Sequence, residues 1–167
     1  MSCLQTLTGI ARDCATSMGG VRKVWITNHA AVTAKTVTND VITAVTLSTG
    51  ETWHAFEFRS ETASLEKSWQ VNKENGTVYV HSTLTMLFHR MTTAKRIELN
   101  ALAMGELAAI VLDNNGTYWY LGYDNPVTID SGDSGTGTAM SDANRYGIVL
   151  GDDSILLPYE VNGSVVE

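Results

Sequence analysis

The alternation of apolar and polar residues predicts one long β-hairpin over residues 61–90. Two alternating runs, 61–72 and 77–90, flank a turn that ends in Asn75-Gly76. Asn-Gly favours a type I′ turn, because both central residues of that turn need a positive φ. At about 3.3 Å per residue each arm is about 40 Å long, roughly twice a common strand. A ribbon of this length needs support from the rest of the domain or from another copy of the chain.

The same alternation assigns the two faces of the hairpin. With Asn75-Gly76 as a two-residue loop, Val71 lies opposite Val80 and one face is mostly apolar; a four-residue loop keeps the same faces. We expect the helix and strands of the same domain to cover this apolar face. The other face is polar and has no obvious partner within the chain, so we predict that it contacts another copy. The predicted contact residues are Glu66, Ser68, Gln70, Asn72, Tyr79, His81, Thr83 and Thr85.

Shorter β-rich segments surround the hairpin. Runs of β-branched and aromatic residues predict strands, and intervening turn residues suggest which strands pair. The expected strands are 21–27, 41–47 paired with 53–59, 107–112 paired with 117–123, and 145–150 paired with 155–161. Residues 1–20 are expected to form an arm, 28–40 a loop, and 130–138 a flexible acidic loop.

One helix is predicted over residues 92–104. Thr92 or Thr93 can cap its first turn, and Gly105 can end it in a left-handed conformation. Apolar residues at helical spacing form a stripe that would pack on a sheet or plug the open end of a sandwich. The stripe consists of Ala94, Ile97, Ala101 and Met104.

The segment 107–123 is apolar on both predicted faces. With Asn115-Gly116 as the turn, Leu112 shares a face with Trp119, and the opposite face carries Tyr118 and Tyr120. A strand pair of this kind is either central in the fold or placed at a subunit contact. Tyr118 and Tyr120 are therefore candidate subunit contacts.

Composition places the chain in the mainly β class. With 167 residues and 44% hydrophobic content, it is long enough for one domain with a sizeable core. We predict a β-sandwich or barrel-like domain with one flanking helix and a long protruding hairpin. The first residues lack a secretory apolar region and no apolar run is long enough to span a bilayer, so no membrane association is expected. Cys3 and Cys14 are predicted to be free thiols.

Charge is concentrated at one end of the sequence. Residues 101–167 carry one arginine against ten acids, a net charge of −9. A surface that grips nucleic acid needs lysine and arginine to displace counterions, so this segment argues against DNA binding. An acidic wall would repel DNA and let it pass.

Catalytic and metal-binding patterns are absent from the sequence. The run 132–135, Gly-Asp-Ser-Gly, resembles the nucleophile signature of chymotrypsin-like proteases, but Thr136 replaces the following glycine and no histidine has the required context. His81 and His89 share a strand face about 26 Å apart, too far for one metal ion. The loop acids lack the spacing of a calcium loop, and no phosphate-binding glycine loop precedes a helix. We therefore expect no enzymatic activity and no cofactor.

The layout of an arm (1–20), a long hairpin (61–90), a helix (92–104) and further strands resembles the tail tube proteins of tailed bacteriophages and injection systems. The stretch 136–150 is also similar to a Gly/Thr loop, an Asp-x-Asn-Gly-Tyr motif and a strand near the end of some phage tail proteins. Arg145 stands where that motif has glycine. The resemblance implies a β-sandwich or barrel whose hairpin contacts the adjacent ring of a stacked hexamer.

The resemblance also implies a place and partners for the protein. It suggests a virion structural protein of the tail, assembled in the host cytoplasm, that forms rings with its own copies and meets other virion tail proteins. DNA would pass through the tube as cargo without specific binding. Candidate lumen-facing acids are Asp130, Asp133, Asp152 and Asp153. The alternative is another phage β-sandwich protein, such as a head decoration, head-tail adaptor or fibre-attachment module.

Overall fold

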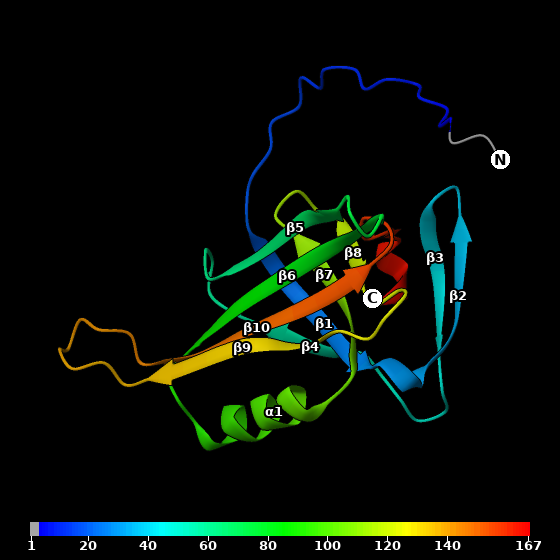
Figure 1. Cartoon of the computed structure of the whole chain (residues 1–167). Coiled ribbons are helices and arrows are strands. Elements are labelled where there is room, and N and C mark those ends of the chain that lie inside the picture. Colours follow the sequence, from blue (N-terminus) through cyan, green and yellow to red (C-terminus); the bar gives the residue numbers. More distant parts are fainter. Residues whose placement is uncertain (1–3) are drawn as a thin grey trace.

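The computed structural model describes residues 4–167 and contains two β-sheets and one α-helix. A seven-stranded sheet has the order β2-β3-β11-β8-β7-β1-β4, and a four-stranded sheet has the order β5-β6-β10-β9 (Figure 1). The strands are β1 (Val21–Asn28), β2 (Val32–Thr38), β3 (Val41–Leu47), β4 (His54–Glu57), β5 (Ala63–Asn72), β6 (Thr77–His89), β7 (Leu107–Asp113), β8 (Tyr118–Leu121), β9 (Thr128–Gly135), β10 (Arg145–Ser154) and β11 (Glu160–Val161). The helix is α1 (Thr93–Met104), and two short 3-10 turns are η1 (His29–Ala31) and η2 (Gly163–Val165). The chain is a mainly β protein with one helix and two sheets, as predicted.

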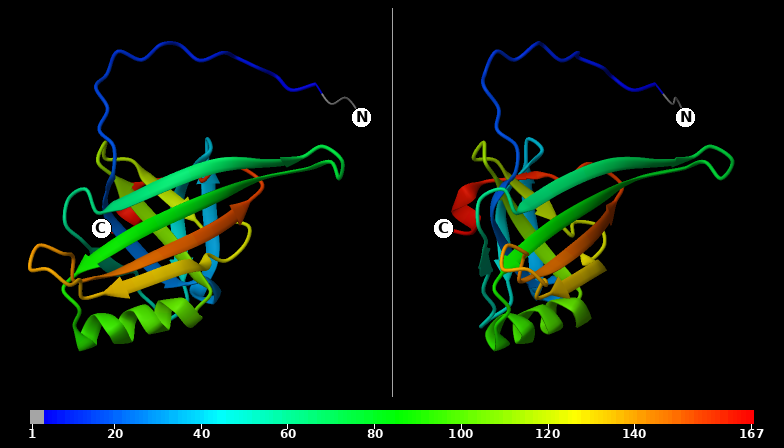
Figure 2. Two further views of the ribbon diagram at one scale, coloured as in Figure 1. Left: turned by 60° about the vertical axis from the view of Figure 1, so that its left-hand side comes forward. Right: turned by 90° about the vertical axis from the view of Figure 1, so that its left-hand side faces the viewer.

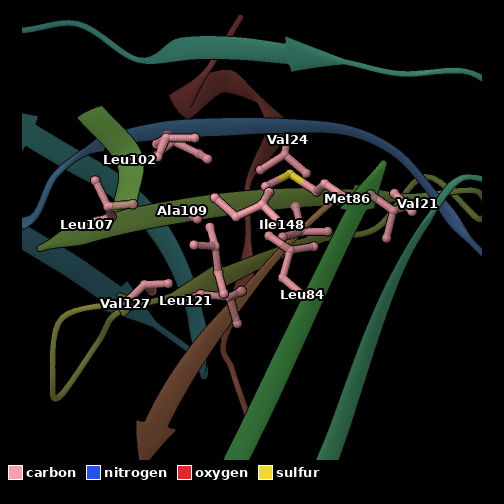
Figure 3. Close-up of a cluster of buried hydrophobic side chains, with 14 of the residues drawn as sticks. Val21, Val24, Leu84, Met86, Leu102, Leu107, Ala109, Leu121, Val127 and Ile148 are labelled. Carbon is pink, nitrogen blue, oxygen red and sulfur yellow. The ribbon is translucent and has the colours of Figure 1, made fainter. Parts of the chain in front are cut away.

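The main core lies between the two sheets. Leu84, Met86 and Ile148 of the four-stranded sheet belong to one buried cluster with residues of β1, β7 and β8 (Figure 3). Each of these strands contributes every second residue to this core, because successive side chains of a strand point to opposite faces of the sheet. Leu102 of α1 also belongs to this cluster.

A second core covers the other face of the seven-stranded sheet. Ile110 and Tyr120 point to this side and are fully buried, together with Ile42 of β3. The C-terminal residues Val165 and Val166 pack against them. Strands β7 and β8 are therefore apolar on both faces because they are central in the fold.

The β7–β8 pair has a different register from the predicted one. Leu112 pairs with Tyr118 and Val111 with Trp119, so residues 114–116 form a three-residue loop. The shift of one residue exchanges the faces, and Trp119 lies with the main core while Tyr118 and Tyr120 lie with the second. Gly116 has φ 87°, the left-handed position that favours glycine in such loops.

Two other predicted pairings are wrong, namely 41–47 with 53–59 and 145–150 with 155–161, and so are two predicted loops. Strand β11 pairs with β3 and β8 and not with β10. Residues 28–40 are not a loop, because β2 lies there and pairs with β3; β4 instead pairs with β1. Residues 130–135 of the predicted flexible loop 130–138 belong to the edge strand β9 (Thr128–Gly135). Strand β10 continues through residues 151–154, which had been predicted as a turn, because it pairs with β6 along its whole length. Turn-forming residue types were overridden by a long partner strand.

The helix forms where it was predicted but faces differently. Thr92 caps it, its hydroxyl accepting from the backbone N–H of Lys95 at 3.4 Å. Gly105 is extended, with φ −92° and ψ 156°, and not left-handed. Leu99 and Leu102 pack against the main core, whereas the predicted stripe is exposed, with Met104 88% exposed. Figures 1 and 2 show α1 running along the side of the sandwich where β4 and β9 are the edge strands.

Candidate assembly surfaces

The hairpin β5–β6 projects beyond the sandwich (Figure 2). It turns through the four residues 73–76, so Val71 pairs with Val78 and not with Val80, and the predicted faces are kept. We call residues 63–68 and 80–89 its proximal half and residues 69–79 its distal half. The proximal half lies over the core, and the distal half extends past it.

The apolar face of the distal half is uncovered. Trp69 is 61% exposed, and Val71 and Val78 are each 58% exposed, although they continue the row that is buried at Val80. The expectation that the domain itself covers the apolar face therefore holds only for the proximal half. Exposed apolar side chains gathered on a projecting element are typical of a contact surface.

Lys67 marks the boundary between the two halves. It lies on the core side, and its ammonium group stands 3.5 Å from the centroid of the Trp119 ring. Trp119 in turn donates its indole N–H to Asp113 at 3.1 Å. Burial lowers the pKa of Lys67, and the Asp113 charge partly opposes that shift. This cation–π contact fixes the hairpin where it leaves the body.

The predicted polar contact residues share the outward face of the four-stranded sheet. Glu66, Ser68, Gln70, Asn72 and Tyr79 are exposed, and His81, Thr83 and Thr85 are half-buried. Some already have local roles. The Asn72 side chain accepts from the backbone N–H groups of Glu74 and Asn75 and so shapes the turn, and Gln70 donates to Ser68 at 3.1 Å. Contact with another copy remains a prediction for this face.

The two candidate tyrosines have different positions. Tyr120 is fully buried in the second core, where burial raises the pKa of its hydroxyl, so it is not available to another copy. Tyr118 is half-buried, stacks near Trp25 with ring centroids 5.8 Å apart, and donates to Glu167 at 3.3 Å. Tyr120 is therefore a core residue of a central strand, whereas Tyr118 stays a candidate for a subunit contact.

Three of the four candidate lumen acids share one face. Asp130, Asp133 and Asp153 lie on the outward face of the four-stranded sheet, with Asp133 3.6 Å from Arg145. Asp152 is an exception, since it is 2% exposed and accepts from the Gly122 backbone N–H at 3.1 Å. Burial raises the pKa of Asp152 to about 6. Asp152 therefore cannot line a lumen.

A groove of about 490 Å³ separates α1 from the edge strand β4. Its walls are mixed: the apolar residues Trp53, Phe56, Phe88 and Leu99 stand beside the charged residues Glu57, Lys95 and Glu98. The helix α1, which forms one wall of this groove, also carries the exposed stripe, in which Ile97 is 56% exposed. Helical spacing identified this stripe in the sequence but not the direction in which it points.

The described part of the arm, residues 4–20, contains no helix or strand and extends away from both sheets (Figure 1). Its last residues are held by the β7–β8 loop, where Asn114 donates to the Gly19 carbonyl at 2.6 Å and Asn115 accepts from Met18 at 2.8 Å. Leu7 and Ile10 are exposed. Cys14 is a free, exposed thiol, and Cys3 lies outside the described residues.

Comparison of the chain with protein-family models, curated proteins and solved structures found no match. Within residues 4–167, no helix has the length and apolar character needed to cross a membrane. Over the same residues, no group of three or more histidine, cysteine or carboxylate side chains is arranged to hold a metal ion. The fold and its exposed surfaces are therefore the features that bear on function.

Proposed function

We propose that this protein is a non-enzymatic virion structural protein of tail tube type, which assembles with its own copies into stacked hexameric rings around passing DNA. The observation that carries the proposal is the uncovered apolar face at Trp69, Val71 and Val78, on a hairpin that projects beyond the sandwich. A second copy can remove this face from water. A heterologous contact between the hairpin and a different patch of the next copy can repeat around or along an assembly.

The outward face of the four-stranded sheet supports a division of roles. Its distal part carries Gln70 and Asn72, beyond the body, whereas its proximal part carries the acids Asp130 and Asp153 near His81. One contact cannot bury the whole face without burying these charged groups at a large cost. We therefore assign the distal half, on both of its faces, to the contact with another copy, and the acidic proximal face to the lumen, where it repels DNA.

The test is the assembly state of the purified chain and of two hairpin variants. Negative-stain microscopy and sedimentation velocity should show rings or tubes for the wild type. The combined variant Trp69→Ser, Val71→Thr and Val78→Thr should remain monomeric, because it removes most of the uncovered apolar area. Gln70→Glu, in the distal half, should weaken assembly, because it places a charge without a partner in the contact.

A matched control is Val37→Thr, which changes another exposed valine on the distant edge strand β2. It should assemble like the wild type, and circular dichroism should show that every variant keeps the fold. A wild type that stays strictly monomeric at high concentration would sink the proposal. Normal assembly of both hairpin variants would remove the hairpin from the contact.

A further inference from the structure

His81 lies between two carboxylates that come from two different strands. Its Nδ1 is 2.7 Å from Asp153 Oδ1 on β10, and its Nε2 is 3.2 Å from Asp130 Oδ2 on β9. Strand β10 runs between β6, which carries His81, and β9. These three side chains therefore join three neighbouring strands across the outward face of the sheet.

A β-bulge and a glycine bring Asp130 within reach of His81. The β9–β10 pairing steps from Ser131 opposite Val149 to Ile129 opposite Leu150, so Asp130 is the extra, unpaired residue. Bulges of this kind redirect a side chain. The Asp130 carboxylate lies over Gly151, where an added Cβ would stand only 2.3 Å from its Oδ2. The lack of a side chain at Gly151 thus opens the path from β9 to β6.

The two contacts require a protonated imidazole ring. A neutral imidazole has one N–H, so it can donate to one carboxylate while its other nitrogen presents a lone pair to the second. Only the imidazolium donates to both. We propose that protonated His81 clamps the edge strand β9 to β6 across β10, and that loss of this proton loosens β9 at the edge of the sheet.

The surroundings of His81 favour the protonated form of its imidazole ring. The Asp153 hydrogen bond is the main cause that raises the pKa of His81 above its ordinary value of 6.5, against partial desolvation, and the Asp130 contact adds to it. The remaining neighbours on this face are Ser68 and Glu66 of β5 and Tyr79 and Thr83 of β6. Asp133 and Arg145 lie farther along the same face, where Asp133 pairs with Gly147 and Arg145 with His89. From the loop 122–127, Asn125 donates to the Asp153 carbonyl, and Asp152 adds negative charge from the buried side.

Strand β9 is suited to local release. It is an edge strand that pairs only with β10 among the described residues, and most of its residues are exposed. Its Asp, Ser and Gly residues are weak strand formers. Segments with few buried contacts open without global unfolding. The clamp therefore controls the order of β9 and not the stability of the whole domain.

The pH dependence follows from the raised pKa of the folded state. The clamp stabilises β9 fully below about pH 6.5, the ordinary value for histidine, and this stabilisation is lost as pH rises through the higher pKa of folded His81. This pH range is separate from the range in which Asp152 titrates, because the pKa of Asp152 is about 6.

The experiment combines side-chain NMR of histidine with amide hydrogen exchange of residues 128–135 between about pH 5 and pH 9. If the wild type assembles, the combined variant Trp69→Ser, Val71→Thr and Val78→Thr is used as the monomer. If the wild type does not assemble, it is used directly, so failure of the assembly proposal leaves this test intact. We expect the protection factors of β9 to fall about two- to fivefold as His81 deprotonates, the effect of a partly exposed ion pair. Core strand β7 should not respond.

Two variants isolate the clamp. Asp130→Asn should move the pKa of His81 toward 6.5 and lower β9 protection. Gly151→Ala should do the same without changing any titratable residue, because its Cβ displaces the Asp130 carboxylate. His89→Gln, on the same face of β6, is the control and should leave both readouts unchanged. Constant β9 protection through the His81 titration, or an unchanged His81 pKa in both clamp variants, would overturn the proposal.

Discussion

The proximal and distal halves of the hairpin β5–β6 have the same alternating sequence pattern but different surroundings. Val80 is fully buried, whereas Val78, two residues earlier on the same face, is 58% exposed. In the proximal half the inward residues meet the seven-stranded sheet, and in the distal half they meet solvent. Alternation therefore determines which face of a strand is apolar, but the extent of the opposing layer determines whether that face is buried.

The largest expected difference between the halves is in global stability. Val80→Ala should lower the free energy of unfolding by about 2–3 kcal/mol, because it removes two methyl groups from a closed core. Val78→Ala is the matched substitution in the distal half and should change it by less than about 0.5 kcal/mol. Urea denaturation of the monomer measures both. Equal effects would mean that the distal half is covered in the free chain.

The sequence predicts local elements of this fold better than the contacts between them. The hairpin, its faces, the helix bounds and the mainly β class follow from local patterns at Asn75-Gly76 and Thr92. The partners β5–β6 and β7–β8 also followed from the turns between them. The other strand partners did not, because β4 pairs with β1 and β9 with β10 through contacts that local turn residues do not encode. The contact surfaces were least predictable, since exposure of Trp69 and Met104 depends on where other layers end.

The second-largest expected effect is a pH dependence of global stability caused by Asp152, a buried acid beside the proximal half. Asp152 pairs with Ser82 of β6 on the core side, and burial raises its pKa from 3.8 to about 6. The folded state thus holds this proton more tightly than the unfolded state, so stability falls as pH rises from about 4 to about 6. Asp152→Asn keeps an acceptor for the Gly122 N–H and removes the buried charge.

We expect Asp152→Asn to raise the free energy of unfolding by about 1–2 kcal/mol above pH 6 and to leave it nearly unchanged below pH 4. Chemical denaturation at several pH values gives this profile. Asp133→Asn is the control on the outward face of the same sheet and should not change the pH 4–6 window, because its carboxylate is not among the charges that act on Asp152. A wild-type profile that is flat between pH 4 and pH 6 would contradict the burial argument.

The smallest global effect is expected at the tip of the distal half. Asn72→Ala removes the acceptor for the backbone N–H groups of Glu74 and Asn75, which stand 3.0 and 3.1 Å from its oxygen. In a turn that is coupled to a core, such a loss costs about 1 kcal/mol. The distal half opens independently of the sandwich, so urea denaturation should detect less than about 0.5 kcal/mol. Hydrogen exchange should instead show faster exchange of residues 69–79 and no change in residues 80–89. A change that spreads into the proximal half would show that the contact between Lys67 and Trp119 does not separate the two halves of the hairpin.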